Sequence, residues 1–404
     1  MASGIADYSF DLLPMICERS DADVVCPRPK NLRRLRRPPG VRVVTPDAFA
    51  KQRNGGKPGA AIYHLGNNPF HEFVYDAAIA RPGIAVFHDL VLHHLLAAIT
   101  VERRGDASRY RGLLEEEYGP VGTRLARLRA RGVATEFEKF LFPMAGHLAR
   151  RSKAVIVHSR DARDRMWAVA PGVPVVIIPH HGGSPPPQVA GTTRASARRE
   201  LGLESDDFVV GHFGFITKPK QPAAVVGGFA RLAAGHPNAR LVMVGADHTG
   251  GGLDRFIAKH RLQDRVRAAG FVDLPRFYTY LRAVDAIVNL RYPSAGESSG
   301  TVARALAEGR ATIVNDLEAF AEIPDEAALK VEIDGDQAEA VGTHLIRLAD
   351  DPGFRARLEA GAQAYAAAAL DPGRCADRYV QVAQAIAAGS PPDEGVRGFA
   401  ITSA

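Results

Sequence analysis

The sequence has little cysteine, little tryptophan and no long apolar run. Three cysteines among 404 residues are too few and too scattered for a disulfide framework or a cysteine-ligated metal site. They are Cys17, Cys26 and Cys375. We therefore expect a reducing compartment and a cytoplasmic protein, and we identify no signal peptide. The most apolar stretch, Gly83 to Leu96, is interrupted by histidines and an aspartate, so we expect no membrane-spanning segment.

Two standard phosphate loops are also absent. The sequence contains neither G-x-x-x-x-G-K-[ST] nor, after a strand, G-x-G-x-x-G. Kinase, nucleoside triphosphatase and nicotinamide-dependent functions are therefore disfavoured. The cluster His88, Asp89, His93 and His94 lacks the H-E-x-x-H spacing of a zinc site, so we expect no metal and no other cofactor.

Basic residues are concentrated in the first 155 residues, in a chain of net charge +6. This asymmetry indicates an acidic partner for the N-terminal half. One tryptophan and no aromatic residues between the arginines argue against nucleic acid. A peripheral contact with the anionic inner face of a membrane fits better, and the alternative is a set of solvated arginine-rich faces. The clusters are Arg33-Arg34-Leu35-Arg36-Arg37, Arg103-Arg104, Arg124 to Arg131 and Arg150-Arg151-Ser152-Lys153.

Short apolar runs alternate with helical stretches along the chain. This pattern is typical of parallel sheets covered on both faces, and it predicts two doubly wound α/β domains. The glycine- and proline-rich segment 182–187 should separate them. The expected strands lie at residues 22–25, 60–65, 84–87, 154–157 and 173–178 in the first half, and at 208–210, 241–244, 286–288, 312–314 and 329–331 in the second.

Polar residues follow several of these strands, where α/β sheets bind their ligands, which predicts a ligand cleft between the domains. The segment Tyr292 to Gly300 places Glu297 at a glycine-bounded turn before a helix. The first N–H groups of a helix lack intrahelical partners and attract phosphate. The turn can thus hold a phosphorylated, hydroxylated ligand. The alternative is an ordinary strand-to-helix turn with Ser299 as N-cap.

A second candidate loop runs from Gly214 to Lys220 and carries Thr217 and Lys218. A lysine in this position can neutralise a pyrophosphate, and the helix that starts near Pro222 would add N–H donors. The alternative for both lysines is a solvated loop.

In the first half, His88 and Asp89 follow one strand and His158 follows another. His88 is a candidate for the wall of the cleft, with Asp89 fixing its tautomer or capping the next helix. A buried core histidine is the alternative. Asn67 and Asn68 are candidates for ligand binding, or simply turn residues.

Several stretches, taken in order, resemble the retaining family-four glycosyltransferases, also called glycosyl transferases group 1. They span the chain from Ser3 to about Ala388: Ser3 to Ser9, Tyr63 to Asn68, Val86 to Asp89, Val157 to Ser159, Phe213 to Thr217 and Gly296 to Gly309. The resemblance implies the GT-B fold, with two Rossmann-like domains facing a cleft. We expect an acceptor-side domain at 1–183, a nucleotide-sugar domain at 184–372, and at 373–404 a helix that crosses back to the first domain plus a flexible tail.

The sequence departs from the family pattern in three places. Glu297 matches the first of the family's two glutamates, but Arg304 stands where the second should bind ribose, and a guanidinium cannot accept hydrogen bonds. The arginine expected after Gly214 is Phe215, although Lys220 is retained. The strand and glycine-rich turn that precede Ser3 in relatives are missing, so the first sheet should lack a strand. Another part of the chain fills its place, or the start codon was set too late.

The resemblance implies transfer of a sugar from a nucleotide diphosphate-sugar to a hydroxylated acceptor, such as a lipid-linked glycan or polysaccharide, with retention of configuration and without metal. The catalytic candidates are Glu297, His88 and Lys220. Donor-binding candidates are Gly214, Thr217, Lys218, Lys220, Gly296, Glu297, Ser298, Ser299, Gly300, Thr301 and Arg304. Acceptor-side candidates are Gly4, Asp7, Tyr8, Asn67, Asn68, His88, Asp89 and His158. The alternatives are an epimerase or phosphorylase on the same fold, and a binding or scaffold subunit.

Overall fold

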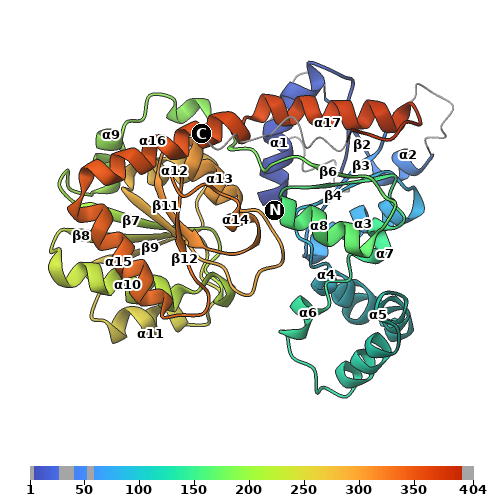
Figure 1. Ribbon diagram of the computed structural model, residues 1–404, viewed down its shortest axis with the longest axis horizontal. Coiled ribbons are helices and arrows are strands. Elements are labelled where there is room, and N and C mark those ends of the chain that lie inside the picture. Colours follow the sequence, from blue (N-terminus) through green and yellow to red (C-terminus); the bar gives the residue numbers. More distant parts are fainter. Residues whose placement is uncertain (1–3, 27–40, 52–58, 394–404) are drawn as a thin grey trace. The chain divides into compact units, whose positions relative to one another are not determined.

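A computed structural model describes residues 4–26, 41–51 and 59–393 (Figure 1). The chain divides into two compact units. The first comprises Met1–His180, Ala295–Ser298 and Pro372–Ala404, and the second comprises His181–Ser294 and Ser299–Asp371. The predicted boundaries, at residues 183/184 and 372/373, fall close to these divisions. The predicted flexible tail and the cluster at residues 33–37 lie outside the described residues.

The first unit contains a parallel sheet of four strands in the order β3-β4-β5-β6. The strands are β3 (Ile62–Leu65), β4 (Ile84–Phe87), β5 (Ala154–Val157) and β6 (Val175–Ile177). Every residue of β4 and β5 is buried, because helices cover both faces of these central strands. The continuous apolar runs seen in the sequence follow from this double burial.

One face of this sheet packs against α1 (Gly4–Cys17) and α17 (Pro372–Ala387), which come from opposite ends of the chain. Tyr8, Ile156 and Tyr379 meet in this core. The helices between the strands are η2 (Pro69–His71), α3 (Glu72–Ala80), α4 (His93–Ala97), η3 (Ala98–Arg103), α5 (Ala107–Ala130), α6 (Glu138–Leu141), α7 (Gly146–Ala149) and α8 (Arg160–Val169). All of them except η2 and α6 contribute residues to the core on the other face of the sheet.

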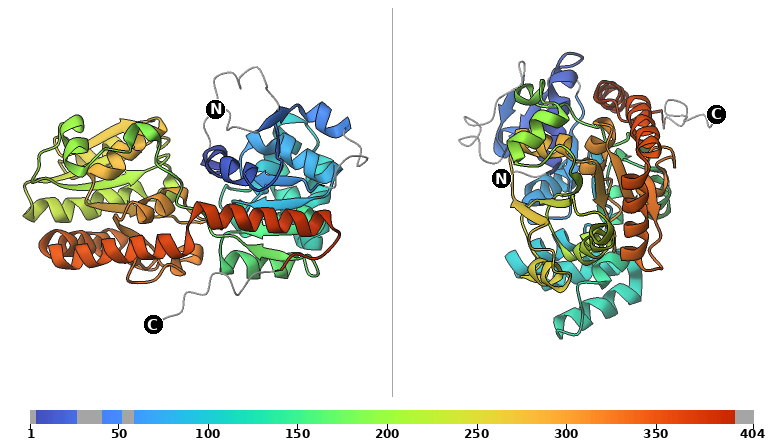
Figure 2. Two further views of the ribbon diagram at one scale, coloured as in Figure 1. Left: turned by 90° about the horizontal axis from the view of Figure 1, so that it is seen from above. Right: turned by 90° about the vertical axis from the view of Figure 1, so that its left-hand side faces the viewer.

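The second unit contains a parallel sheet of six strands in the order β12-β11-β10-β7-β8-β9, with helices on both sides of the strands (Figure 2). The strands are β7 (Phe208–Phe213), β8 (Ala239–Val244), β9 (Val266–Gly270), β10 (Ala286–Asn289), β11 (Ala311–Asn315) and β12 (Leu329–Val331). The helices are η4 (Pro187–Val189), α9 (Arg194–Leu201), η5 (Lys218–Lys220), α10 (Pro222–Gly235), α11 (Gly252–Lys259), α12 (Leu274–Ala283), α13 (Gly300–Ala307), α14 (Glu318–Ala321), α15 (Gln337–Asp350) and α16 (Pro352–Ala369).

The structure differs from the predicted strands in two respects. The strand expected at 22–25 is β1 (Asp23–Val25), but it pairs with β2 (Arg42–Val44) in a separate sheet, near α2 (Pro46–Lys51). The strands β2 and β9 were not predicted, since each carries an exposed arginine within a short apolar run. The helix α1 covers one face of the four-stranded sheet. No described helix combines the length and apolarity that crossing a bilayer requires.

Candidate functional site

The lysine loop of the second unit begins where β7 ends. Gly214 has φ +90°, a conformation that strongly favours glycine. Lys220 folds back over it, and its Nζ donates a hydrogen bond of 3.0 Å to the carbonyl oxygen of Phe213. A Cβ at position 214 would collide with Lys220 Nζ and lie 3.9 Å from Thr301 Oγ1. The loop and the start of α13 therefore meet at Gly214.

The helix α13 begins with a side-chain cap. Ser299 Oγ accepts a hydrogen bond of 3.3 Å from the backbone N–H of Val302. Ser299 is therefore the N-cap of α13. The N–H groups of Gly300 and Thr301 come before the first intrahelical donor, the N–H of Ala303, and they point out of the helix start. With the Lys220 ammonium beside them, these groups form a site of positive potential suited to an anion.

Glu297 lies in a short segment, Ala295–Ser298, that belongs to the first unit and is called the tip below. The N–H groups of Leu90 and Val91 donate to the carbonyl oxygen of Ala295, at 2.8 and 3.0 Å. Gly296 has φ +74° and lies so close to Leu90 that a Cβ would overlap its side chain. Half-buried Glu297 closes the tip, since its Oε2 accepts from the N–H of Ala295 at 2.6 Å. Ser298 completes the tip and is also half-buried.

Two buried polar side chains lie near the C-terminal ends of β7 and β10 in the second unit. His212 Nδ1 donates to the carbonyl oxygen of Val288, at 3.1 Å, whereas its Nε2 has no hydrogen-bond partner within the described part of the chain. Both amide atoms of fully buried Asn289 likewise have no hydrogen-bond partner among the described residues. Burial, followed by the charge of Lys220, lowers the pKa of His212 to about 3. Buried polar groups without hydrogen-bond partners are rare. Those of His212 and Asn289 lie near the C-terminal end of the sheet, where Lys220 also lies.

The remaining donor-side candidates have different surroundings. Thr217 precedes η5 and its carbonyl oxygen accepts from the N–H of Lys220, while Lys218 is exposed. Arg304 is buried, and its Nη1 donates to Tyr278 Oη at 2.8 Å. Phe215 is exposed and packs edge-on against His248. Neither the Arg304–Tyr278 contact nor the unsatisfied groups of His212 and Asn289 were predicted from the sequence.

In the first unit, three histidines form a hydrogen-bonded chain. His158 Nδ1 lies 2.8 Å from the carbonyl oxygen of Ile178, and its Nε2 lies 3.1 Å from His88 Nδ1. His88 Nε2 lies 3.0 Å from His64 Nδ1. A carbonyl oxygen only accepts, so for neutral rings each Nδ1 donates, and the Nε2 atoms of His158 and His88 accept. This histidine chain (His64, His88 and His158) uses both ring nitrogens of His88.

Burial keeps His88 and His158 neutral. It lowers the pKa of His88 well below the ordinary value, and the neighbouring His158 and His64 add to the effect. It also lowers the pKa of His158 to about 4. A contact between His88 and a sugar would require one of the two neighbouring rings to release a nitrogen. His88 and His158 were each predicted from the sequence, but His64 was not, although it lies within the motif Tyr63 to Asn68.

The other acceptor-side candidates divide into a core group and a polar group. Tyr8 is buried, and its hydroxyl lies 3.0 Å from that of Tyr379. Gly4 and Asp7 lie on the first two turns of α1, exposed and half-buried respectively.

The polar group surrounds Asn67. Its backbone N–H donates to Asp89 Oδ2 at 2.7 Å, and its side chain joins His94 Nδ1, also at 2.7 Å. Asn68 Oδ1 accepts from the N–H of Phe70 and caps η2. These side chains are half-buried, so Asn67, Asn68 and Asp89 form an ordered polar surface on the first unit.

Most arginines in the described clusters form ion pairs. Arg103 and Arg104 contact Glu72, and Arg104 also contacts Asp76. Arg150 and Arg151 contact Glu116. The solvated-face alternative therefore describes these two clusters better than a membrane contact does. In the described residues, no group of three or more His, Cys, Asp or Glu side chains is arranged to hold a metal ion.

Comparison with known proteins identifies a domain within the second unit. Residues 193–365 match the model of the family described as glycosyl transferases group 1. The chain contains a glycosyl transferases group 1 domain. This domain includes Gly214, Lys220 and α13, and it confirms the family predicted from the sequence.

A curated relative, the D-inositol 3-phosphate glycosyltransferase of Mycobacteroides abscessus, is 33% identical over 159 residues, which are 37% of this chain and 33% of that protein. The match thus spans a third of the relative's length. Two solved structures resemble nearly the whole chain. Anabaena HepE in complex with UDP and glucose has a TM-score of 0.63 and 16% identity, covering 95% of this chain and 96% of that one. Sucrose-phosphate synthase from Thermosynechococcus elongatus has a TM-score of 0.57 and 21% identity, covering 85% and 78%. These likenesses confirm the predicted GT-B fold.

Proposed function

We propose that the protein transfers a sugar from a nucleotide diphosphate-sugar to a hydroxylated acceptor. The observation that carries this proposal is the meeting of Lys220 and the start of α13 at Gly214, inside the glycosyl transferases group 1 domain. A diphosphate placed there receives one ammonium and the N–H groups of Gly300 and Thr301. Anabaena HepE, solved with UDP-glucose, supports a uridine nucleotide as the first donor to test.

The site supplies the electrostatic stabilisation that this reaction needs. Negative charge develops on the diphosphate as its bond to the sugar breaks, and fixed donors aimed at that charge lower the barrier. Lys220 and the helix start are fixed by the Phe213 carbonyl and by the Ser299 cap. Glu297, held by the N–H of Ala295, would accept hydrogen bonds from sugar hydroxyls. We assign Lys218 and Thr217 to the outer rim of the diphosphate site.

The acceptor would bind to the first unit. The ordered polar surface of Asn67, Asn68 and Asp89 offers both donors and acceptors to sugar hydroxyls. We further propose retention of configuration, independence from metal, and an acceptor presented at an anionic membrane surface. Product anomers resolved by NMR, activity in excess EDTA and vesicle binding test these three points separately.

The primary experiment incubates the purified chain with UDP-, GDP- and ADP-sugars and measures release of nucleotide. One donor should be consumed, and Lys220→Ala and Glu297→Ala should each slow its release by one to two orders of magnitude. Lys259→Ala, which removes an exposed lysine on α11, is the matched control and should have no effect. Release that neither site variant slows would overturn the assignment. Nucleotide binding by calorimetry without turnover would favour the binding or scaffold alternative.

A further inference from the structure

The helices between β4 and β5 carry an unusual share of the exposed apolar side chains. Twelve large hydrophobic residues are exposed in the described part of the chain, and five of them fall within residues 121–141. They are Val121, Leu128, Val133, Phe137 and Leu141. The last three are 64%, 50% and 61% exposed. This segment comprises the second half of α5, the turn after it and α6. Figure 1 shows α5 and α6 at the lower end of the first unit, below α4.

Three arginines share this surface. The helix α5 is kinked at Gly119, and from there one face carries Val121, Arg124, Arg127 and Leu128, with Arg131 following directly after the helix. At about 100° per residue, these five positions lie within an arc of about 120°. All five are exposed, whereas Leu125 and Ala126 on the other side are buried. Basic and apolar side chains therefore lie next to one another on one helix face.

The charge of this surface is not neutralised locally. Residues 120–141 contain five basic residues and two acidic residues, which leaves a net charge of 5 − 2 = +3. The two acidic residues are Glu136 and Glu138, and they pair with Arg129 and Lys139. Arg124, Arg127 and Arg131 make no ion pair with any residue that the structure describes. They differ in this from the paired arginines at 103–104 and 150–151.

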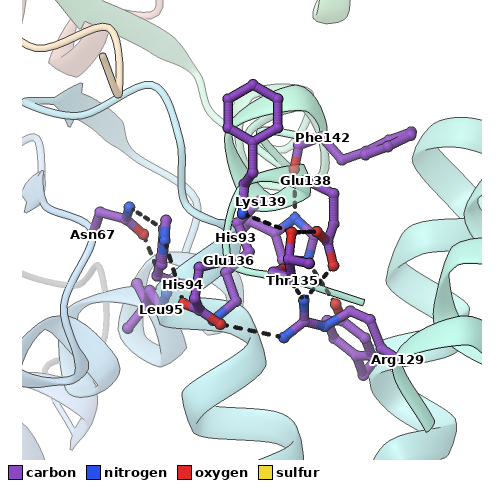
Figure 3. A network of polar contacts seen from close by, with 12 residues as sticks. Asn67, His93, His94, Leu95, Arg129, Thr135, Glu136, Glu138, Lys139 and Phe142 are labelled. Carbon is purple, nitrogen blue, oxygen red and sulfur yellow. Dashed lines mark hydrogen bonds and ion pairs between the residues drawn. The ribbon is translucent and has the colours of Figure 1, made fainter. Parts of the chain in front are cut away.

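A polar network fixes the turn that presents the apolar side chains (Figure 3). Arg129 Nη1 donates to the carbonyl oxygen of Thr135 and to Glu138 Oε1, both within 3.1 Å. Lys139 pairs with Glu136, and the backbone N–H of Val133 donates to the carbonyl oxygen of Leu128. The exposed apolar side chains thus project from an ordered support.

We propose that this surface, Val121 to Leu141, docks the protein onto an anionic phospholipid membrane. Arginines without acidic partners attract anionic headgroups, and neighbouring Leu, Val and Phe side chains can enter the interface between headgroups and acyl chains. A nucleic acid would use the arginines but leave these aliphatic side chains in water. The inference deepens the proposed function, since it identifies the surface that would hold the enzyme at a membrane-bound acceptor. Of the described sequence-predicted clusters, it retains Arg124 to Arg131 and leaves out the ion-paired clusters at 103–104 and 150–151.

The test is flotation of the full chain with vesicles of phosphatidylcholine, alone or with 30% phosphatidylglycerol, at 0.1 M salt and without donor. The protein should float only with the anionic vesicles. Replacing Arg124, Arg127 and Arg131 together by Gln should lower the partition coefficient about 150-fold, roughly fivefold for each arginine. Phe137→Ser with Leu141→Ser should also lower it, although the net charge does not change. Circular dichroism of each variant verifies that it is folded.

The matched control replaces three exposed cations of the second unit, Arg199, Arg255 and Lys259, by Gln. It removes the same charge and should float like the wild type. The proposal is overturned if the protein does not float, if it floats equally with neutral vesicles, or if the control triple weakens flotation as much as the arginine triple. Binding of an oligonucleotide or self-association through this surface, without flotation, would likewise overturn it. Because no step uses a sugar donor, failure here leaves the nucleotide-release result unaffected.

Discussion

The histidine chain makes the stability of the first unit depend on pH. His158 is buried with its pKa lowered to about 4, whereas an unfolded histidine titrates near 6.5. Below pH 6.5 the unfolded state therefore binds more protons than the folded state. The stabilisation that neutral His158 provides is complete above pH 6.5 and is lost progressively as the pH falls to 4. Integrating between pH 7.5 and 5.5 gives a loss of about 1.3 kcal/mol from this residue.

The variant His158→Asn isolates this contribution. Its amide nitrogen can replace Nδ1 as donor to the carbonyl oxygen of Ile178, but it does not titrate. Urea unfolding followed by circular dichroism at the two pH values should show that the wild type loses about 1.3 kcal/mol more than the variant. Ile156→Val, in the same core, is the control and should destabilise about equally at both pH values, by roughly 1 kcal/mol. Equal losses in the wild type and in His158→Asn would refute the neutral histidine chain.

Three further predictions concern the second unit. Lys220→Met should weaken binding of the donor nucleotide by about 10- to 100-fold in calorimetry, because a charge-assisted contact to the diphosphate is lost. Gly214→Ala should weaken it as well and lower the melting temperature, since φ +90° strains the new side chain and its Cβ displaces Lys220. Phe215→Arg should tighten nucleotide binding about tenfold by adding a second cation. Unchanged affinities in all three variants would contradict the placement of the diphosphate.

Much of the fold was predictable because buried parallel strands leave a strong sequence signal. The runs at β4, β5, β10 and β11 are apolar on both faces, so their positions followed directly from the sequence. The strand β9 lies at the edge of the sheet and is only partly buried, so its sequence is not a continuous apolar run. Its exposed Arg267 interrupts the pattern, and the strand was therefore not predicted. Pairing was harder to predict than position. The run at β1 was found, but nothing local to it indicates that its partner is β2.

In the candidate site, too, the positions of the residues were easier to predict than their contacts. Gly214, Lys220 and Thr301 were predicted to lie together because ligands bind at strand ends in α/β sheets, and the structure places them side by side. The histidine chain could not be predicted, because it depends on the register that brings the ends of β3, β4 and β5 together. Arg304 was named for its place in the family motif, but its contact with Tyr278 comes from another helix, α12.

A crystal structure with the nucleoside diphosphate of the preferred donor tests the central claim most directly. Phosphate oxygens should lie within hydrogen-bond distance of Lys220 Nζ and of the N–H groups of Gly300 and Thr301. A nucleotide bound elsewhere, or bound with its diphosphate turned away from Lys220 and the start of α13, would contradict it.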